Sequence, residues 1–330
     1  MKARWILIAS LFLYSLPGYS SSGGGHDDSR QVTVNGTPVS RTFKPMKNAA
    51  HTEDLNFKAA LISISKPAFA PNSFSANVPF YNLVFAGNID TTPGGNKFWD
   101  LESDAQVFGK ANGLQLIDAG TAMNFKDANY FKSVSLSILG KGVTAKEYYY
   151  LSDDGLYAKG MAIAAQTVTG SGITLDVPAQ EVLYNPSKLI CTFPLTYDGS
   201  LHTVPQYDRT IKATASGTSA LGIPDGTPVS YVLTFNDTYK VLSWGGLRLI
   251  ENEKPVNALL VQTESKTVGT IYINGEKAPQ QVLAPLKMTQ DATSTVISYS
   301  FRNTTYPDNL AEFSLNGTKV TYLNTIKTVR

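Results

Sequence analysis

The segment "KSVSLSIL", residues 132 to 139, decides the fold class, because apolar and polar side chains alternate along it with a period of two. The apolar residues stand at 134, 136 and 138, and a serine precedes each of them. Successive side chains of a strand point to opposite faces, so this segment is expected to be a strand that buries one face. "YNLVFAGNI", residues 81 to 89, alternates in the same way and ends at a Gly-Asn pair. From about Leu55 onward, short β-prone runs separated by Gly, Pro, Asn and Asp predict further strands.

Turn signals between these runs predict that neighbouring strands are antiparallel. Asn274-Gly275 stands inside "TVGTIYINGEKAPQQVL", and Asn316-Gly317 stands inside "AEFSLNGTKVTYL". Both central residues of a type I′ turn need positive φ, which Asn-Gly tolerates well. "YYYLSDDGLYAKG", residues 148 to 160, likewise predicts a strand, a turn at Asp-Asp-Gly and a returning strand, with tyrosines on both faces.

Helical patterning is scarce by comparison. Residues 104 to 116 are expected to hold one short helix, weakened by Gly109 and Gly113. No strand alternates with a ten-residue helix, which disfavours a parallel doubly wound sheet. We therefore expect an all-β chain with at most one or two short helices. It should form a large curved antiparallel sheet or half-barrel, and a two-sheet β-sandwich is the alternative.

The N-terminal end predicts export. Residues 1 to 20 have the form of a signal peptide, with Lys2 and Arg4 ahead of an apolar centre that is too short to span a bilayer. Residues 21 to 54 are expected to be a flexible linker with an edge hairpin at Asn35-Gly36, and residues 55 to 330 a single antiparallel β domain. No integral membrane segment is expected after removal of the signal. The protein should be secreted or lie in the periplasm or cell envelope.

Composition argues against several partners and anchors. Removal of Lys2 and Arg4 reduces the 28 basic residues by two, to match the 26 acidic ones. A protein that binds nucleic acid or an anionic membrane needs a surplus of basic residues on one face, and this chain has no overall surplus. Neither is therefore an expected partner. No cysteine precedes the "SSSGGG" tether, which disfavours a lipoprotein anchor. The single cysteine, Cys191, lies in the apolar run "LICTFPL" and is interpreted as a small buried hydrophobe rather than a nucleophile.

Motifs for catalysis are missing from the sequence. It contains no G-x-S-x-G, H-E-x-x-H, C-x-x-C or G-x-G-x-x-G pattern and no Walker A loop. Its three histidines lie far apart, which removes most zinc sites. We therefore assign no catalytic residue, no metal ligand and no cofactor. The question of catalysis stays open, with a non-enzymatic role favoured.

Aromatic residues supply the candidate binding positions. The ligand-contacting candidates are Trp99, Tyr148, Tyr149, Tyr150 and Trp244, whose rings could stack on a ligand. Asp100 and Glu102 are two apart and would share one face of a strand, so they are candidate polar partners. The competing explanations are a plain hairpin for the tyrosines and a solvated strand edge for the carboxylates.

Several segments occur together in a recognisable order. They include "FWDL" (98 to 101), "FKDANYF" (125 to 131), "YYYLSDDGLYAKG" and "FPLTYDGSL" (193 to 201). In this order, over about residues 75 to 323, the chain resembles a group of uncharacterised β-rich secreted proteins of the Bacteroidota. The resemblance implies a secreted β-rich protein and implies no known activity.

Three functions follow as hypotheses. The first is an exported, non-enzymatic envelope or extracellular protein that binds an apolar or amphipathic ligand, or an envelope partner, on a concave sheet face. The second is a surface protein that binds or acts on carbohydrate through the aromatic candidates. The third is a structural or adhesive module. The expected ligand is lipid-like or a glycan, and the oligomeric state stays open.

Overall fold

A computed structural model describes residues 14–15, 33–34, 37–38, 63–64, 77–85, 88–101, 105–116, 124–139, 141–170, 172–249, 254–286, 288–304, 306, 308–316 and 319–326. Most of these residues lie in strands. The long strands are β5 (Asn77–Phe85), β6 (Gly94–Asp100), β7 (Ala105–Leu116), β8 (Tyr130–Ile138), β9 (Lys141–Leu151), β10 (Gly155–Ile163), β13 (Gln180–Thr192), β16 (Tyr207–Ser216), β17 (Thr227–Arg248), β18 (Val256–Ile273), β20 (Ala292–Arg302), β21 (Ala311–Asn316) and β22 (Lys319–Ile326).

Short strands and a few helical turns complete the described elements. The short strands are β1 (Tyr14–Ser15), β2 (Thr33–Val34), β3 (Thr37–Pro38), β4 (Ser63–Ile64), β11 (Gln166–Gly170), β12 (Ile173–Val177), β14 (Leu195–Thr196), β15 (Leu201–Thr203) and β19 (Glu276–Lys277). The helical turns are η3 (Ser219–Leu221), α1 (Gln280–Leu283) and η4 (Ala284–Leu286). Among the described residues, no helix has the length and apolar character needed to span a membrane.

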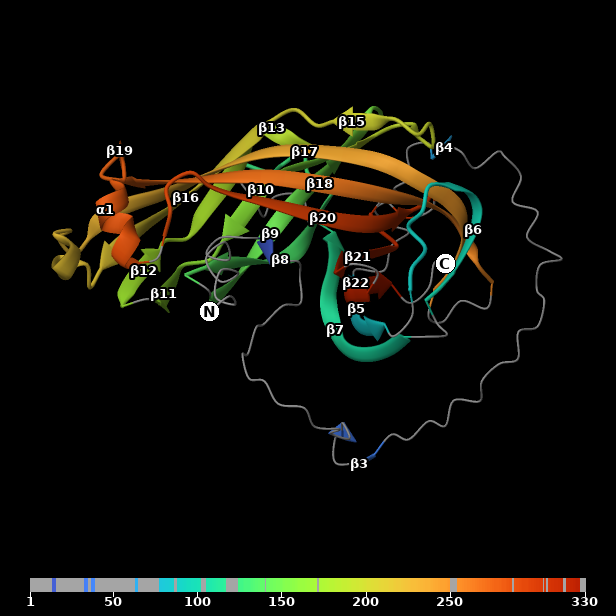
Figure 1. Ribbon diagram of the computed structural model, residues 1–330, viewed down its shortest axis with the longest axis horizontal. Coiled ribbons are helices and arrows are strands. Elements are labelled where there is room, and N and C mark those ends of the chain that lie inside the picture. Colours follow the sequence, from blue (N-terminus) through green and yellow to red (C-terminus); the bar gives the residue numbers. More distant parts are fainter. Residues whose placement is uncertain are drawn as a thin grey trace, which may run out of the picture.

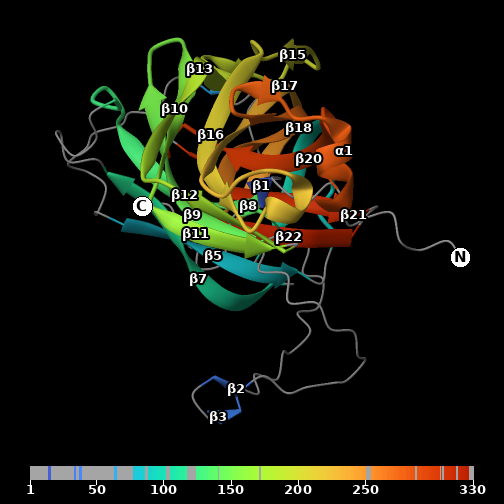
Figure 2. The same ribbon diagram turned by 90° about the vertical axis from the view of Figure 1, so that its left-hand side faces the viewer.

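The long strands form one curled antiparallel sheet, a half-barrel, which confirms the predicted fold class. Strands β17, β18 and β20 run side by side along its length (Figure 1). The ladder continues from β20 through β21, β22, β5 and β7, and from β17 through β16, β13, β10 and β9. Strand β8 pairs with β9 along its whole length and with β7 over three residue pairs. The end view therefore shows strands around a common interior (Figure 2).

Local sequence explains the hairpins. Strands β9 and β10 pair with Tyr150 opposite Tyr157, which confirms the hairpin expected over residues 148 to 160. Asn274 and Gly275 have φ of 51° and 83°, the positive values that a type I′ turn needs between β18 and β19. Strands β21 and β22 pair across Asn316 as expected. A register shift after Val241 marks a bulge in the long strand β17, and a bulge bends the strand that carries it.

Two features differ from the simplest expectation. Residues 105–116 form strand β7 instead of the short helix expected over 104 to 116, because β5 and β8 offer it ladder partners on both sides. Strand β6 pairs with the C-terminal part of β17 in parallel, the one parallel ladder among the described strands. The expected signal peptide and linker lie outside the described residues, except for β1, which pairs with β8, and the β2–β3 pair.

The core lies on the inner face of the sheet. Along β9, Val143 and Ala145 are buried while Thr144 and Lys146 between them are exposed. Aromatic rings fill much of the interior: Trp99 meets Phe301 edge to face at 4.9 Å, and Tyr130 stacks on Tyr149 at the same distance between ring centroids. Cys191 is fully buried, as expected, and burial raises the pKa of its thiol.

Candidate functional site: a charged cavity on the inner face

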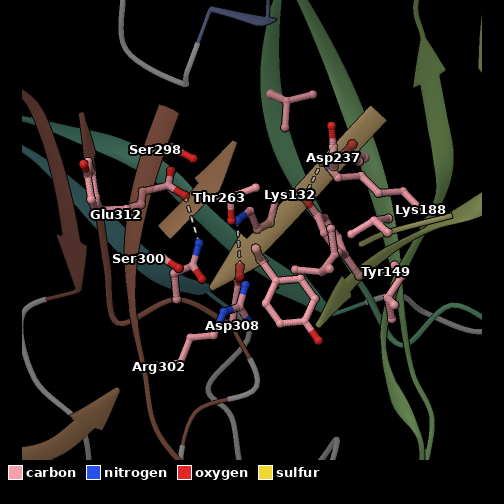
Figure 3. A pocket seen from close by; sticks show the side chains of 18 of the residues that line it. Lys132, Tyr149, Lys188, Asp237, Thr263, Ser298, Ser300, Arg302, Asp308 and Glu312 are labelled. Atoms are coloured by element: carbon pink, nitrogen blue, oxygen red, sulfur yellow. Dashed lines mark hydrogen bonds and ion pairs between the residues drawn. The ribbon is translucent and has the colours of Figure 1, made fainter. Parts of the chain in front are cut away.

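The interior of the curled sheet contains a cavity of about 150 Å³, which we name the inner cavity. Strands β8, β9, β13, β17, β18, β20 and β21 all contribute to its wall, together with the loop before β21 (Figure 3). Its lining includes three basic and four acidic side chains: Lys132, Lys188, Arg302, Glu147, Asp237, Asp308 and Glu312. The remaining lining residues are Val134, Tyr149, Leu189, Ile190, Val204, Tyr239, Thr263, Ser298, Tyr299, Ser300, Asn309 and Phe313.

Lys132 and Asp308 form an ion pair in the cavity wall. Lys132 Nζ lies 2.8 Å from Asp308 Oδ2, and the two side chains are 12% and 2% exposed (Figure 3). Burial alone would lower the pKa of Lys132, but the negative charges of Asp308, Glu312 and Glu147 outweigh it and raise the pKa overall. Lys132 therefore stays protonated at neutral pH, so this pair is a true buried salt bridge.

A second ion pair joins Lys188 to Asp237, with 3.3 Å between Nζ and Oδ2. Asp237 is 1% exposed and also accepts hydrogen bonds from Ser265 Oγ at 2.6 Å and from the Tyr207 hydroxyl at 3.3 Å. Burial would lower the pKa of Lys188, and the charges of Asp237 and Glu147 more than compensate, so its pKa is raised. The protein itself thus satisfies both carboxylate oxygens of Asp237.

Glu147 is held between two tyrosines. Its Oε2 accepts a hydrogen bond from the Tyr149 hydroxyl and its Oε1 accepts one from the Tyr184 hydroxyl. Burial raises the pKa of Tyr184, and the charge of Glu147 raises it further, so this phenol remains a proton donor. Glu147 is 4% exposed, so both of its oxygens are committed to these contacts rather than to water.

Arg302 and Asn309 form the part of the wall at the β20–β21 connection. Arg302 is 8% exposed; burial would lower the pKa of its guanidinium, but the Cys191 thiol and the nearby carboxylates of Asp308 and Glu312 raise the pKa overall. Asn309 is 9% exposed; its Nδ2 donates to Glu312 Oε2 at 3.0 Å, whereas its Oδ1 has no partner among the described residues. This part of the wall therefore combines a guanidinium that has carboxylates near it with a buried amide oxygen that has no partner among the described residues.

Of the aromatic residues singled out from the sequence, Tyr149 lines the inner cavity and the others lie elsewhere. Trp99 is 3% exposed, and its Nε1 donates to the Asp90 carbonyl at 2.8 Å. Tyr148 is buried on the opposite face of β9, where it stacks on Phe125. Both rings are therefore part of the packing.

The remaining candidates lie nearer the surface. Tyr150 is half-buried, with Lys159 Nζ 5.4 Å above its ring centroid, and Trp244 is half-buried on β17. Asp100 Oδ2 lies 3.4 Å from Arg248 Nη1, across the parallel β6–β17 ladder. Glu102, the other proposed polar partner, lies outside the described residues. The structure does not gather the described candidates into one site.

Sequence reasoning missed the charged residues of the cavity, although they leave a signal. Lys132 lies an even number of positions from the apolar residues of "KSVSLSIL", so it is on the same face of the strand as they are. Glu147 is related in the same way to Val143 and Ala145. A charged residue on the buried face of an alternating strand is unusual, since buried charges are costly unless they are paired. The same signal marks Asp237 between Phe235 and Tyr239.

Metal coordination has no support in the described part of the chain, where no three His, Cys, Asp or Glu side chains are grouped as metal ligands would be.

Comparisons with protein-family models, curated proteins and solved structures found no match for this chain. The resemblance to secreted Bacteroidota proteins therefore stays a prediction.

Proposed function

We propose that this protein is an exported, non-enzymatic binding protein that holds a small ligand, or the polar end of an amphipathic ligand, in the inner cavity. One observation carries the proposal: seven charged side chains, six from different strands and one from the loop before β21, converge on a single cavity inside the sheet. Four of them, Glu147, Asp237, Arg302 and Asp308, are less than a tenth exposed.

The energetics of buried charges support a role in binding rather than in folding. Transfer of an ion out of water costs several kcal/mol even after the protein relaxes. Replacement of a buried ion pair by well-packed apolar residues is often neutral, or stabilising by about 1–4 kcal/mol. Stability alone therefore gives little reason for this sheet to keep Lys132, Asp308 and Arg302 inside. Recognition of a polar ligand would explain why these charged side chains are kept in the interior.

The size of the cavity limits the ligand. A cavity of about 150 Å³ can hold one benzene molecule, and the inner cavity has about the same volume. The charged lining selects a polar molecule of this size, or a head group whose apolar remainder extends beyond the cavity. The second case matches the amphipathic ligand expected from the sequence.

The carbohydrate alternative receives less support. It needs aromatic rings exposed in a row beside carboxylates, and among the described candidates Trp99, Tyr148 and Tyr149 are buried. The structural alternative interprets the cavity charges as a network that fixes strand register, a role that buried polar groups have in some proteins. A paired substitution separates this role from ligand binding.

The experiment compares two double variants by native mass spectrometry after gentle purification. Lys132→Met with Asp308→Leu replaces the buried pair by apolar residues of similar size. The matched control is Lys277→Met with Asp291→Leu, which removes an exposed ion pair with side chains 52% and 47% exposed. We expect a bound small molecule on the wild type and on the control, and none on the cavity variant.

Urea unfolding of the same proteins checks that the cavity variant is folded, and we expect its free energy of unfolding to equal or exceed that of the wild type. Retention of the ligand by a folded cavity variant would contradict the proposal. So would a wild type that carries no small molecule and binds none from a panel of small polar compounds.

A further inference from the structure

Part of strand β20 has a neighbouring strand on one side only. Its register with β18 runs without a shift from Ala292 to Arg302, whereas β21 pairs with it only at residues 299–301. No ladder joins β20 to any other described strand, so residues 293–297, which we name the β20 edge, form a margin of the sheet. Figure 1 shows this margin between α1 and β21.

The backbone groups of the β20 edge point away from β18. Along an antiparallel strand, residues that bond to one neighbour alternate with residues that face the other side. In β18, the N–H and C=O of Ile271 bond to the Gln290 side chain, on the side where β20 lies. Every second residue of β18 before Ile271 therefore faces β20. Thr293, Thr295 and Ile297 pair with the intervening residues of β18, so their own N–H and C=O groups face outward.

The other end of β20 shows the same alternation. The Phe301 carbonyl accepts a hydrogen bond of 2.7 Å from Leu310 N, on the side of β21. Steps of two residues back from Phe301 lead to Ile297, Thr295 and Thr293. The side chains of these three residues are exposed, that of Ile297 to 42%. Each of them therefore offers one N–H donor and one C=O acceptor at the margin of the sheet.

The β20 edge lacks the features that usually protect a sheet margin. Charged side chains, proline, bulges and very short strands discourage other chains from pairing with an edge. Two other margins of this sheet have such features: β19 consists of Glu276 and Lys277, and β6 carries Lys97 and a register shift in its ladder with β17. The β20 edge has the sequence "TSTVI", which is rich in β-branched residues and has no charge, proline or glycine. This composition favours pairing with another strand.

A second copy of this chain does not fit the β20 edge. A two-fold axis would pair the two β20 strands antiparallel, with Thr295 of each copy opposite the other. Tyr299 of one copy would then lie opposite Asp291 of the other, and β21, which pairs with Tyr299 on the same side, would collide with the chain at Asp291. Lys277 and Thr270 hold Asp291 in this place. A separate extended peptide that ends before β21 avoids the collision.

We propose that the β20 edge binds an extended, uncharged peptide segment of another polypeptide, which joins the curled sheet as one further strand. The peptide backbone exchanges hydrogen bonds with the N–H and C=O groups of Thr293, Thr295 and Ile297. Its side chains on the exposed face lie beside the same three residues, which favours β-branched or aromatic residues at alternate positions of the peptide. This inference goes beyond the proposed function, because the β20 edge binds whether or not the inner cavity holds a ligand.

The test measures binding of short peptides to the full chain by fluorescence anisotropy. The first probe is a fluorescein-labelled Thr-Val-Thr-Val-Thr peptide with blocked ends, and the panel replaces Val by Ile, Phe or Tyr. N-methylation of the two alternate residues leaves each peptide one edge with free N–H groups and prevents its own aggregation. The matched control is N-methylated at all five residues. We expect saturable binding of at least one probe, and binding about 10-fold weaker or less for its control.

Variants of the chain assign the contact to the β20 edge. Thr295→Pro removes an N–H that faces outward and keeps the bonds to β18, and proline is tolerated on edge strands for this reason. It should weaken the tightest probe by about 10-fold or more, whereas Thr295→Val keeps the N–H and should bind like the wild type. Thermal unfolding checks that each variant is folded. Thr295→Lys, which places a charge on the edge, preserves the test if Thr295→Pro is not folded.

Amide hydrogen exchange, followed by NMR, locates the bound peptide. Without peptide, the amides of Thr293, Thr295 and Ile297 should exchange faster than those of Ser294 and Val296, which face β18. With the tightest probe, exchange at the three outward amides should slow.

Four results would overturn the peptide inference. They are no binding by any probe at about 1 mM, equal binding by the wild type and the folded Thr295→Pro and Thr295→Lys variants, slowed exchange only outside the β20 edge, and a dimer that protects these amides without peptide. The last result would assign the edge to a second copy. None of them depends on the ligand that native mass spectrometry seeks in the inner cavity, so this inference and the proposed function fail separately.

Discussion

At the scale of single residues, hydrogen bonding decides the ionisation of Asp90. Lys97 Nζ lies 2.6 Å from one carboxylate oxygen of Asp90, and the Thr92 hydroxyl donates to the other at 2.6 Å. These bonds stabilise the ionised form, the one from Lys97 most, and lower the pKa of Asp90 to about 2. Because the folded pKa is depressed, the stabilisation is complete above the unfolded value near 4 and is lost as the pH falls through the folded pKa.

We predict a titration midpoint of about 2 for the Asp90 carboxyl, measured by carbon-detected NMR. Lys97→Met should move the midpoint upward, toward the ordinary value for Asp. Asp90→Asn should lower the free energy of unfolding between pH 5 and 7 by a small amount, since Asp90 is exposed, and this effect should fade as the pH drops through about 2. A wild-type midpoint near 4 would contradict this explanation.

Only some of the residues that line the inner cavity can be predicted from the sequence. Tyr149 is predictable as an aromatic residue of a Tyr-rich strand, and it does line the cavity. Lys132 and Glu147 could have been predicted as cavity residues, because each is a charged residue on the otherwise apolar face of an alternating strand. Arg302 could not, because its surroundings come from a loop and from strands far away in the sequence.

At the scale of elements, glycine allows the close approach of the parallel strands β6 and β17. Gly245 lies opposite Lys97, and a Cβ at this position would stand 2.0 Å from the Lys97 carbonyl oxygen. Backbone atoms cannot rotate away as a side chain can. Any larger residue at 245 must therefore separate the two strands.

We predict that Gly245→Ala lowers the free energy of unfolding by about 3 kcal/mol, the upper end of the usual cost of overpacking. The matched control is Gly142→Ala in β9, where a Cβ would meet only Ser135 Oγ at an ordinary 3.5 Å. It should be neutral, or stabilising by about 0.5–1 kcal/mol, since Gly is unfavourable in a strand interior. Urea unfolding of both variants measures the difference, and equal effects would contradict the close approach.

Local chemistry predicts the hairpins because their determinants are local. Asn274-Gly275 adopts the positive φ values that its turn type needs, whatever the rest of the sheet does. The helix predicted over residues 104 to 116 is wrong for the opposite reason. The sequence there, with Gly109 and Gly113, has weak preferences of its own, and pairing with β5 and β8 decides the outcome.

At the scale of the whole molecule, the choice between a curled sheet and a two-sheet sandwich depends on pairings that no single segment specifies. Alternation shows that a strand has a buried face but does not show which other strand covers it. Here β8 pairs with β9 and also with β7, so the sheet curls around one interior. Charged side chains from distant parts of the chain meet inside it for the same reason, which gives the inner cavity its chemistry.

The most direct test of the binding site is a crystal structure of the protein purified without dialysis or denaturation, with attention to the electron density in the inner cavity. We predict density for an organic molecule there, with polar atoms about 2.7–3.2 Å from charged side chains of the lining, the distance of a hydrogen bond. Density for water alone in the inner cavity would contradict the assignment of this cavity as a ligand site.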